Sequence, residues 1–409
     1  MTTERVHTAA DLGLMAGAPP FDADRLVTLG NWQEPPFNRW AFQHVAELIP
    51  TARIPRADGH LWRLHREERD LSHLSIRRDG HALGLDHFLE QTYTDGLLVL
   101  HGGTIVHEAY FNSMRPDSRH LLMSVSKSVT SAVCGVLVER GQVVPDEAVT
   151  TYLPELAGTS WDGCTVRHLL DMRAGTRFDE DYANLEADVR VYEQVYLWRP
   201  RTDRGLPEDI TAYYATLENA GPHGGSFEYR SVLTDVLAWV MERAAGARFA
   251  DLVSRELWEP MGAEFDAEIT VDGHGNPMAD GGVSCTLRDL ARFGLLLSRD
   301  GRRGEHPVVP KAWIADTLSA DEDTVAAFVD SLDAREFPAG AYYRNQIWVI
   351  DASAPIYMCS GINGQTVLIH GRADVVVAKF STWPVAWTNE FAIMTWKGLV
   401  NLAEQVAAG

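Results

Sequence analysis

Strand-forming sequence occurs towards both ends of this chain, with helical sequence between. The segment GLLVLHGGTIVHEAYF at 96–111 consists of two β-rich runs around Gly102 and Gly103, which is the composition of a hairpin with a tight turn. Near the other end, strand patterns occur at 341–350, 365–370 and 374–380, followed by a helical pattern at 388–408. This order predicts one antiparallel sheet built from both parts of the chain, with a helical region inserted.

The inserted region has apolar side chains at helical spacing. Residues 128–138 carry apolar positions at the i, i+3, i+4 spacing of a buried helix, and a second stripe runs from Leu233 to Met241, although both could be pure core. We therefore expect an α/β (α+β) fold with an active site between sheet and helices. The expected segments are 1–90 as an N-terminal extension and helical lead-in, 91–120 with 265–409 as a sheet subdomain, and 121–264 as a mostly helical subdomain.

Composition excludes several function classes. The 409 residues carry 36 basic and 57 acidic side chains, a net charge of −21 that repels phosphate backbones and anionic lipids, so we expect a small-molecule partner and neither nucleic acid nor membrane. The first twenty residues lack the apolar core of a signal peptide, which predicts a cytoplasmic protein. Four widely spaced cysteines give no metal-ligand pattern, so no metal or cofactor is expected. The oligomeric state, a homodimer included, stays open.

The sharpest local motif is Ser124-Val125-Ser126-Lys127 at the start of the first apolar helix. A spacing of three places Ser124 and Lys127 on one face of a helix, so the amine can reach the hydroxyl. Lysine can remove the hydroxyl proton only when burial or a nearby cation makes it neutral. The helix N-terminus would stabilise the resulting negative charge. The alternative is an ordinary serine N-cap with a solvated lysine.

Three motifs in order resemble those of the penicillin-recognising serine hydrolases: Ser124 to Lys127, then Tyr229-Arg230-Ser231, then Gly361-Ile362-Asn363-Gly364-Gln365. The chain is most similar to the 6-aminohexanoate-dimer hydrolases, which are relatives of class C β-lactamases and β-lactamase-like carboxylesterases. The resemblance spans nearly the whole chain, and it includes the segments FNRWAF, RHLLMSVSKS, YLPELAG and TDVLAW. It implies a β-lactamase-like fold.

The resemblance also implies roles for individual residues. Ser124 would be the acylated nucleophile, Lys127 its general base, and Tyr229 the phenol that relays a proton to the leaving amine. The backbone N–H groups of Ser124 and Ile362 would form the oxyanion hole. Segment 361–365 could instead be a simple turn, and Tyr229 taken alone could be a core residue.

Substrate contacts follow from the same resemblance. Tyr182 would reach the scissile amide, Glu193 would attract a free ammonium group of the substrate, and Trp198 would close over the site. The acidic neighbours of Tyr182 could form a solvated loop. Asp280 would line the pocket, and Asn363 stands where the dimer hydrolases have histidine. The Lys-Thr-Gly motif of the β-lactamases is absent, which predicts poor β-lactam turnover.

These features predict a serine hydrolase that cleaves small linear amides of the 6-aminohexanoate oligomer type through an acyl-enzyme on Ser124. Short-chain esters are the alternative substrates, because an ester needs less protonation of its leaving group. A non-catalytic ligand sensor with the same cleft is a third reading, and it conflicts with the intact Ser124, Lys127 and Tyr229.

Overall fold

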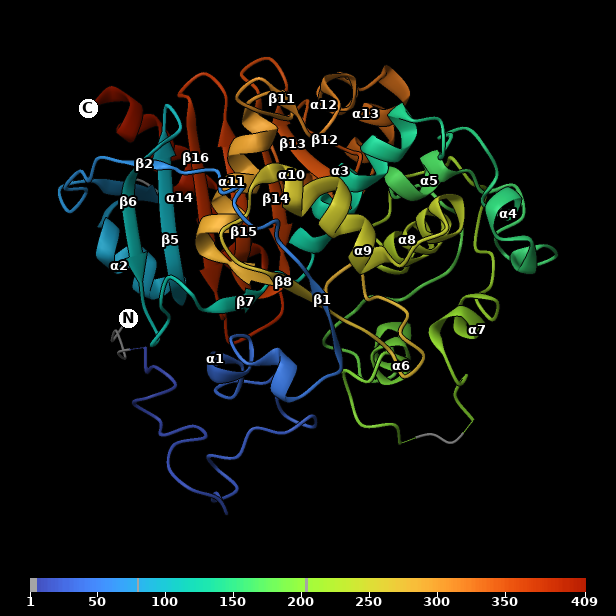
Figure 1. Cartoon of the computed structure of the whole chain (residues 1–409), viewed down its shortest axis with the longest axis horizontal. Coiled ribbons are helices and arrows are strands. Elements are labelled where there is room, and N and C mark those ends of the chain that lie inside the picture. Colours follow the sequence, from blue (N-terminus) through green and yellow to red (C-terminus); the bar gives the residue numbers. More distant parts are fainter. Residues whose placement is uncertain (1–5, 79–80, 203–204) are drawn as a thin grey trace.

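An eight-stranded sheet forms the centre of the molecule (Figure 1). The computed structural model describes residues 6–78, 81–202 and 205–409. The strand order is β12 (Tyr342–Arg344), β13 (Ile347–Asp351), β14 (Ile356–Gly361), β15 (Gln365–His370), β16 (Val375–Ser381), β5 (Thr94–His101), β6 (Thr104–Tyr110) and β2 (His65–Arg66). Strand β16 pairs antiparallel with β5, with Val377 opposite Val99. The predicted sheet, built from both parts of the chain, is therefore confirmed.

The expected single strand at 341–350 is instead a hairpin, β12–β13. Asn345 and Gln346 at its turn have φ values of 49° and 59°, the left-handed pair of a tight hairpin turn. The Gln346 side chain is buried and donates to the carbonyl of Leu169, 2.8 Å away, so the turn is fixed by contacts with the helical region. Strand β14 was not predicted, because its short apolar run lacks a clear period.

A second sheet was also not predicted. Its four strands are β1 (Thr51–Ile54), β8 (Ala267–Thr270), β9 (Val283–Thr286) and β7 (Arg119–Leu121), in that order. Runs of three or four residues carry too little alternation to be recognised in a sequence. The N-terminal segment also contains the antiparallel pair β3 (Ser75–Arg78) and β4 (His81–Gly84). Among its described residues, the α-helices are only the short α1 (Asn38–Ala41) and α2 (Leu85–Gln91). The helical lead-in expected there is therefore wrong.

Helix α3 (Val125–Glu139) is buried over most of its length, and it packs against α8 (Val232–Ala245) and against β14 and β15. Both predicted apolar stripes are thus confirmed as helices. Gly135 gives α3 a flat face for Trp313, because a Cβ there would lie 2.5 Å from the indole Cγ. The other helices of this region are α4 (Val149–Tyr152), α5 (Val166–Leu170), α6 (Asp188–Val195), α7 (Ile210–Tyr214), α9 (Phe249–Val253) and α10 (Glu259–Met261).

Helices α11 (Leu287–Ser298) and α14 (Asn389–Ala408) pack on the large sheet (Figure 1). A Cβ on Gly294 of α11 would lie 2.6 Å from Val367 and Val376, so this glycine permits the close approach. Thr388 caps α14 by accepting a hydrogen bond from the Phe391 N–H, and the helical pattern at 388–408 is confirmed. Helices α12 (Lys311–Thr317) and α13 (Glu322–Val329) precede a short 3-10 turn, η4 (Asp333–Glu336).

Two further observations concern the chain as a whole. The four cysteines are buried and free. None of the helices in the described ranges is long and apolar enough to cross a bilayer. We propose that residues 121–264 form a mostly helical subdomain beside the sheet, because helices α3 to α10 all fall within this range.

Candidate active site

Ser124 stands at a sharp turn between β7 and α3. Met123 adopts a left-handed φ of 46°, and Ser124 is the N-cap residue of the helix that follows. Lys127 lies one turn further along, and its Nζ is 2.8 Å from Ser124 Oγ. The lysine side chain is only 1% exposed. The expected proximity of amine and hydroxyl is present, and the solvated lysine of the alternative reading is not.

The lysine amine is surrounded by acceptors. Besides Ser124, Lys127 Nζ donates to Ser231 Oγ at 2.9 Å, to the Asp280 carbonyl at 3.1 Å and to Asp280 Oδ2 at 3.4 Å. Burial lowers the pKa of Lys127, but Tyr229, Asp280 and Glu180 raise it and outweigh burial, so the net shift of this pKa is upward. The acceptors around Nζ and the Asp280 carboxylate at 3.4 Å thus favour an ammonium group in the resting site, and they argue against the expected uncharged amine.

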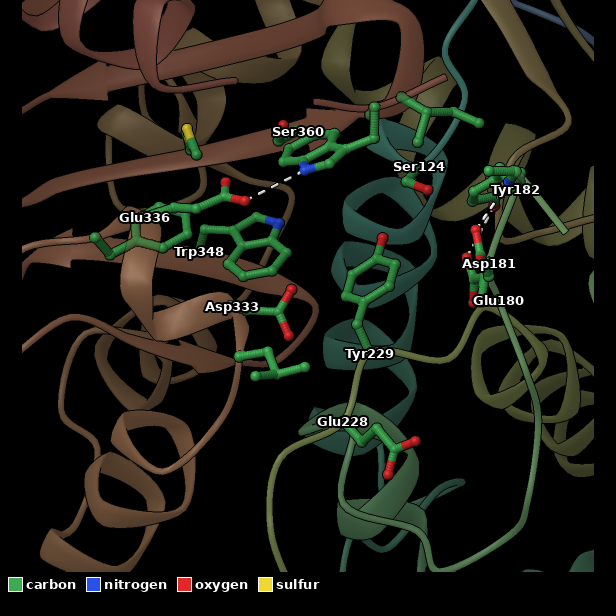
Figure 2. A pocket seen from close by; sticks show the side chains of 17 residues that line it. Ser124, Glu180, Asp181, Tyr182, Glu228, Tyr229, Asp333, Glu336, Trp348 and Ser360 are labelled. Carbon is green, nitrogen blue, oxygen red and sulfur yellow. Dashed lines mark hydrogen bonds between the residues drawn. The ribbon is translucent and has the colours of Figure 1, made fainter. Parts of the chain in front are cut away.

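Tyr229 faces the same point from the segment that leads into α8. Its hydroxyl points towards Ser124 in Figure 2, and Lys127 Nζ lies 5.0 Å from its ring centroid. The ring stacks on Trp348 at 5.5 Å between centroids, which fixes its orientation. Burial raises the pKa of Tyr229 more than the Lys127 charge lowers it, so the net shift of this pKa is upward.

The C-terminal end of β14 meets the start of α3 at the nucleophile. A Cβ on Gly361 would lie 2.9 Å from Ser124 N and 2.8 Å from the Leu122 carbonyl, so only glycine permits this contact. The Ser124 N–H lies at the N-terminus of α3, where N–H groups lack partners within the helix. Ile362 follows Gly361 and lines the adjoining cavity. The geometry is compatible with an oxyanion hole at these two residues.

A cavity of about 470 Å³ opens from Ser124 towards the 3-10 turn η4 (Figure 2). Aromatic side chains form much of its wall, and carboxylates lie between them. None of the described residues that line it is basic. The aromatic members are Tyr182, Tyr229, Phe337, Trp348 and Trp387, and the acidic members are Glu180, Asp181, Glu228, Asp333 and Glu336. An acidic, aromatic cavity favours an amine-bearing or uncharged ligand over an anion.

A second hollow on the other side of Ser124 holds only about 20 Å³, and it is lined by the predicted contacts Tyr182, Glu193, Trp198 and Asp280. Glu193 is buried between two guanidinium groups, with Oε2 2.7 Å from Arg190 Nη1 and 2.5 Å from Arg199 Nε. Its charge is already neutralised, so the expectation that Glu193 is free to attract a substrate ammonium group is wrong. Trp198 is buried against Trp32, and it donates its indole N–H to Thr270 Oγ1.

Asn363 also differs from its expected role. It adopts a left-handed φ of 56°, and its Nδ2 donates to the carbonyls of Trp383 and Val385 at 3.0 Å and 3.2 Å. It lines neither hollow beside Ser124. The predicted substrate contact is therefore wrong, and Asn363 instead holds the turn between β14 and β15.

The sequence analysis gave Glu180 no role, because the acidic neighbours of Tyr182 could equally form a solvated loop. Its carboxylate accepts hydrogen bonds from Ser231 N–H and Ser231 Oγ–H, each at 2.6 Å, and from the Tyr182 hydroxyl at 2.9 Å. Tyr182 lines both hollows. The Arg190 guanidinium carbon lies over the Tyr182 ring, 5.5 Å from the ring centroid. Its place two residues before Tyr182 was the only signal that could have found Glu180.

A buried serine and lysine at a helix N-terminus, beside a tyrosine and at the mouth of a cavity, define the class of serine hydrolases that use lysine instead of histidine. The family model described as Beta-lactamase matches residues 85–390 of this sequence. The chain belongs to the β-lactamase family and is a serine hydrolase.

Two of the similar proteins match almost the whole chain, and a third matches about a third of it. A 6-aminohexanoate-dimer hydrolase from Paenarthrobacter ureafaciens is 38% identical over 396 residues, which cover 96% of this chain and 94% of the relative. The esterase EstB from Burkholderia gladioli is 31% identical over 155 residues, 36% of this chain and 38% of that protein. A solved Bacillus anthracis structure, provisionally described as a 6-aminohexanoate-dimer hydrolase, has 25% identity and a TM-score of 0.84, covering 93% of this chain and 97% of its own.

Proposed function

We propose that this chain is an amidohydrolase that cleaves small linear amides of the 6-aminohexanoate oligomer type through an acyl-enzyme on Ser124. The observation that carries the proposal is the 2.8 Å contact between Lys127 Nζ and Ser124 Oγ at the end of a roomy cavity. The relative named as a 6-aminohexanoate-dimer hydrolase supports the choice of substrate class.

In the proposed reaction, Ser124 Oγ attacks the amide carbonyl and its proton passes to the Lys127 amine. The N–H groups of Ser124 and Ile362 donate to the developing oxyanion. Tyr229 gives its proton to the leaving nitrogen, because an amide bond does not break until that nitrogen is protonated. Water then hydrolyses the acyl-enzyme in the reverse sequence of proton transfers. Tyr182 would contact the scissile amide, and its position in the lining of both hollows beside Ser124 supports this role.

The cavity walls support a linear substrate that carries an amine. An alkyl chain would lie against Trp348 and Phe337, while Asp333 and Glu336 at the far end would attract an ammonium group. Incubation with the linear dimer of 6-aminohexanoate should release free amine, and Ser124→Ala should abolish the release. Intact-protein mass spectrometry should detect an acyl adduct on Ser124. Binding of these substrates without amine release and without an adduct would instead support a ligand sensor.

Hydrolysis of short-chain esters is the second candidate, and similarity to the esterase EstB favours it. The same nucleophile would serve, with less demand on Tyr229 because an alkoxide leaves more readily than an amine anion. A burst of p-nitrophenol from p-nitrophenyl acetate would reveal this activity. The ratio of kcat/KM for a matched linear amide and ester would decide which substrate the site prefers.

The proposal extends to the setting of the enzyme. A net charge of −21 supports a small-molecule partner without nucleic acid or membrane, and four buried free cysteines are compatible with the reducing cytoplasm. Whether the enzyme is a monomer or a homodimer would be measured by analytical ultracentrifugation.

A further inference from the structure

The proposed function needs Lys127 in its neutral form, because only a neutral amine can accept the Ser124 proton. Four acceptor oxygens surround Lys127 Nζ, and one belongs to the Asp280 carboxylate at 3.4 Å, a setting that favours an ammonium group. An ammonium nitrogen has no lone pair with which to accept the Ser124 proton. Lys127 must therefore lose a proton before it can act as a base. The Lys127 side chain is only 1% exposed, so direct release of this proton to bulk water is hindered. A buried route for that proton is needed.

The contacts around Ser231 provide a continuous route. Lys127 Nζ lies 2.9 Å from Ser231 Oγ, and Ser231 Oγ lies 2.6 Å from Glu180 Oε1. The second carboxylate oxygen of Glu180 accepts the Ser231 backbone N–H at 2.6 Å, which fixes the carboxylate against this residue. Three groups from α3, the start of α8 and the loop before α6 thus form an aligned chain of hydrogen bonds.

We infer that Glu180 accepts the proton that Lys127 must lose, and that the hydroxyl of Ser231 passes it on. The inference rests on the proposed function. Lys127 gives one proton to Ser231 Oγ as Ser231 gives its own hydroxyl proton to Glu180, so a neutral amine and a neutral carboxylic acid result. The amine lone pair then takes the Ser124 proton as Ser124 Oγ bonds to the substrate carbonyl carbon. Glu180 acts through Ser231, so it is a positioning residue.

Several groups face Glu180 and influence its protonation. Burial raises the pKa of Glu180, the Lys127 charge and the Ser231 hydrogen bonds lower it, and the net shift of this pKa is upward. A raised pKa makes a carboxylate a better proton acceptor. The titratable and charged groups that interact with it are Lys127 on α3, Tyr182 on its own loop, Tyr229 and Arg230 before α8, Asp280 before β9, and Tyr343 on β12.

The pH dependence of acylation tests the inference. We would measure kcat/KM for p-nitrophenyl acetate against pH in the full chain and in two variants, Glu180→Gln and Ser231→Ala. Glu180→Gln removes the acceptor together with its charge, whereas Ser231→Ala breaks the route and keeps the charge. In the unaltered enzyme, kcat/KM should rise on the acidic side of the pH profile as the Glu180 carboxyl group loses its proton. Both variants should lose at least tenfold in kcat/KM near neutral pH, and their acidic limb should no longer follow the titration of Glu180.

Other outcomes would overturn the inference. If Glu180 acts only as a charge that holds the Lys127 proton, Glu180→Gln should move the limb to lower pH and Ser231→Ala should leave it in place. A loss of kcat/KM that is the same at every pH, with the acidic limb of the profile unchanged, would indicate that Glu180 and Ser231 have a structural role alone. Glu180→Asp keeps a carboxylate and should restore part of the acidic limb. Ser231→Ala removes a single atom, so it keeps the test usable if Glu180→Gln does not fold.

Two controls complete the design. Glu186→Gln removes the same charge from an exposed position in the same loop, and it should leave the profile unchanged. The acyl adduct on Ser124 is verified in the unaltered enzyme by mass spectrometry before the variants are compared. Failure to acylate there would count against the proposed function, whereas normal acylation with identical pH profiles in all variants would count against the Glu180 route alone.

Discussion

Gly361 lies directly against the backbone nitrogen of Ser124, so close that a Cβ at residue 361 would stand 2.9 Å from it. The C-terminal end of β14, an interior strand of the large sheet, and the N-terminus of α3 therefore meet at the nucleophile itself. A change of a single methyl group at this contact must move either the strand or the serine, because neither neighbour is the flexible end of a side chain.

Gly361→Ala should reduce kcat/KM for p-nitrophenyl acetate by about tenfold or more, because displacement of the strand misplaces the oxyanion donors. Circular dichroism should show an intact fold. Gly273→Ala is the matched control, since a Cβ there would meet no atom within 4 Å, and it should retain full activity. Equal activity of the two variants would show that the Gly361 contact does not shape the oxyanion hole.

Lys127→Met should make stability more sensitive to pH. Loss of the cation leaves the Glu180 carboxylate, whose pKa is already raised by burial, without its main counter-charge. A group with a raised folded-state pKa favours the folded state at low pH and costs stability as pH rises through that pKa. The melting temperature of the variant should thus fall from mildly acidic to neutral pH relative to the unaltered protein. A constant difference in melting temperature across this range would contradict the expectation.

Tyr182→Phe should affect amides more than esters. The Tyr182 hydroxyl donates to Glu180 at 2.9 Å and lies at the mouth of the cavity, where we propose that it contacts the scissile amide. The variant should lose more kcat/KM with the linear dimer of 6-aminohexanoate than with p-nitrophenyl acetate. Equal losses on the two substrates would remove the amide-specific role of this residue.

Glu193→Gln should lower stability and not substrate affinity. The change leaves Arg190 and Arg199 without their shared buried carboxylate, which costs roughly 3 kcal/mol when one partner of a buried ion pair is removed. Chemical denaturation would measure the loss. KM for an amine-bearing amide should change little, whereas a large rise in KM at unchanged stability would restore Glu193 as the ammonium site.

Asp333→Asn combined with Glu336→Gln should raise KM for amine-bearing amides severalfold and leave KM for a neutral ester unchanged. Burial raises the pKa of both carboxyl groups, so their charge is lost as pH falls into the mildly acidic range. Affinity of the unaltered enzyme for an amine should therefore weaken with falling pH, and this dependence should vanish in the double variant. Steady-state kinetics at several pH values would check both points.

The sequence was informative where a pattern is long or strongly constrained. The stripe at 128–138 identified α3, and the three motifs identified the family, because helix periodicity and motif order survive in a single sequence. Lys127 and Ser124 were paired correctly from their spacing alone. The sheet joining β5 to β16 followed from strands at both ends of the chain.

The charge balance around Lys127 and the short strands could not be predicted from the sequence. The upward shift of the Lys127 pKa comes from Tyr229, Asp280 and Glu180, which reach the amine from segments whose placement no local pattern reveals. Glu193 looked free in the sequence, although Arg190 lies three residues before it on α6 and can reach it there. Its second partner, Arg199, becomes a neighbour only when the segment after α6 folds back. Asn345 and Gln346 interrupt an apparently continuous strand only through contacts with the helical region.

The tight fit of Gly135 on α3 against Trp313 has a consequence for the history of the molecule. The helix that carries the reactive pair is locked in place, whereas the far wall of the cavity includes Leu332, 73% exposed, and Trp387, 36% exposed. Reactivity and selectivity thus reside in separate parts of the scaffold. New substrate ranges can arise by exchange of a few rim side chains while the reactive helix stays untouched.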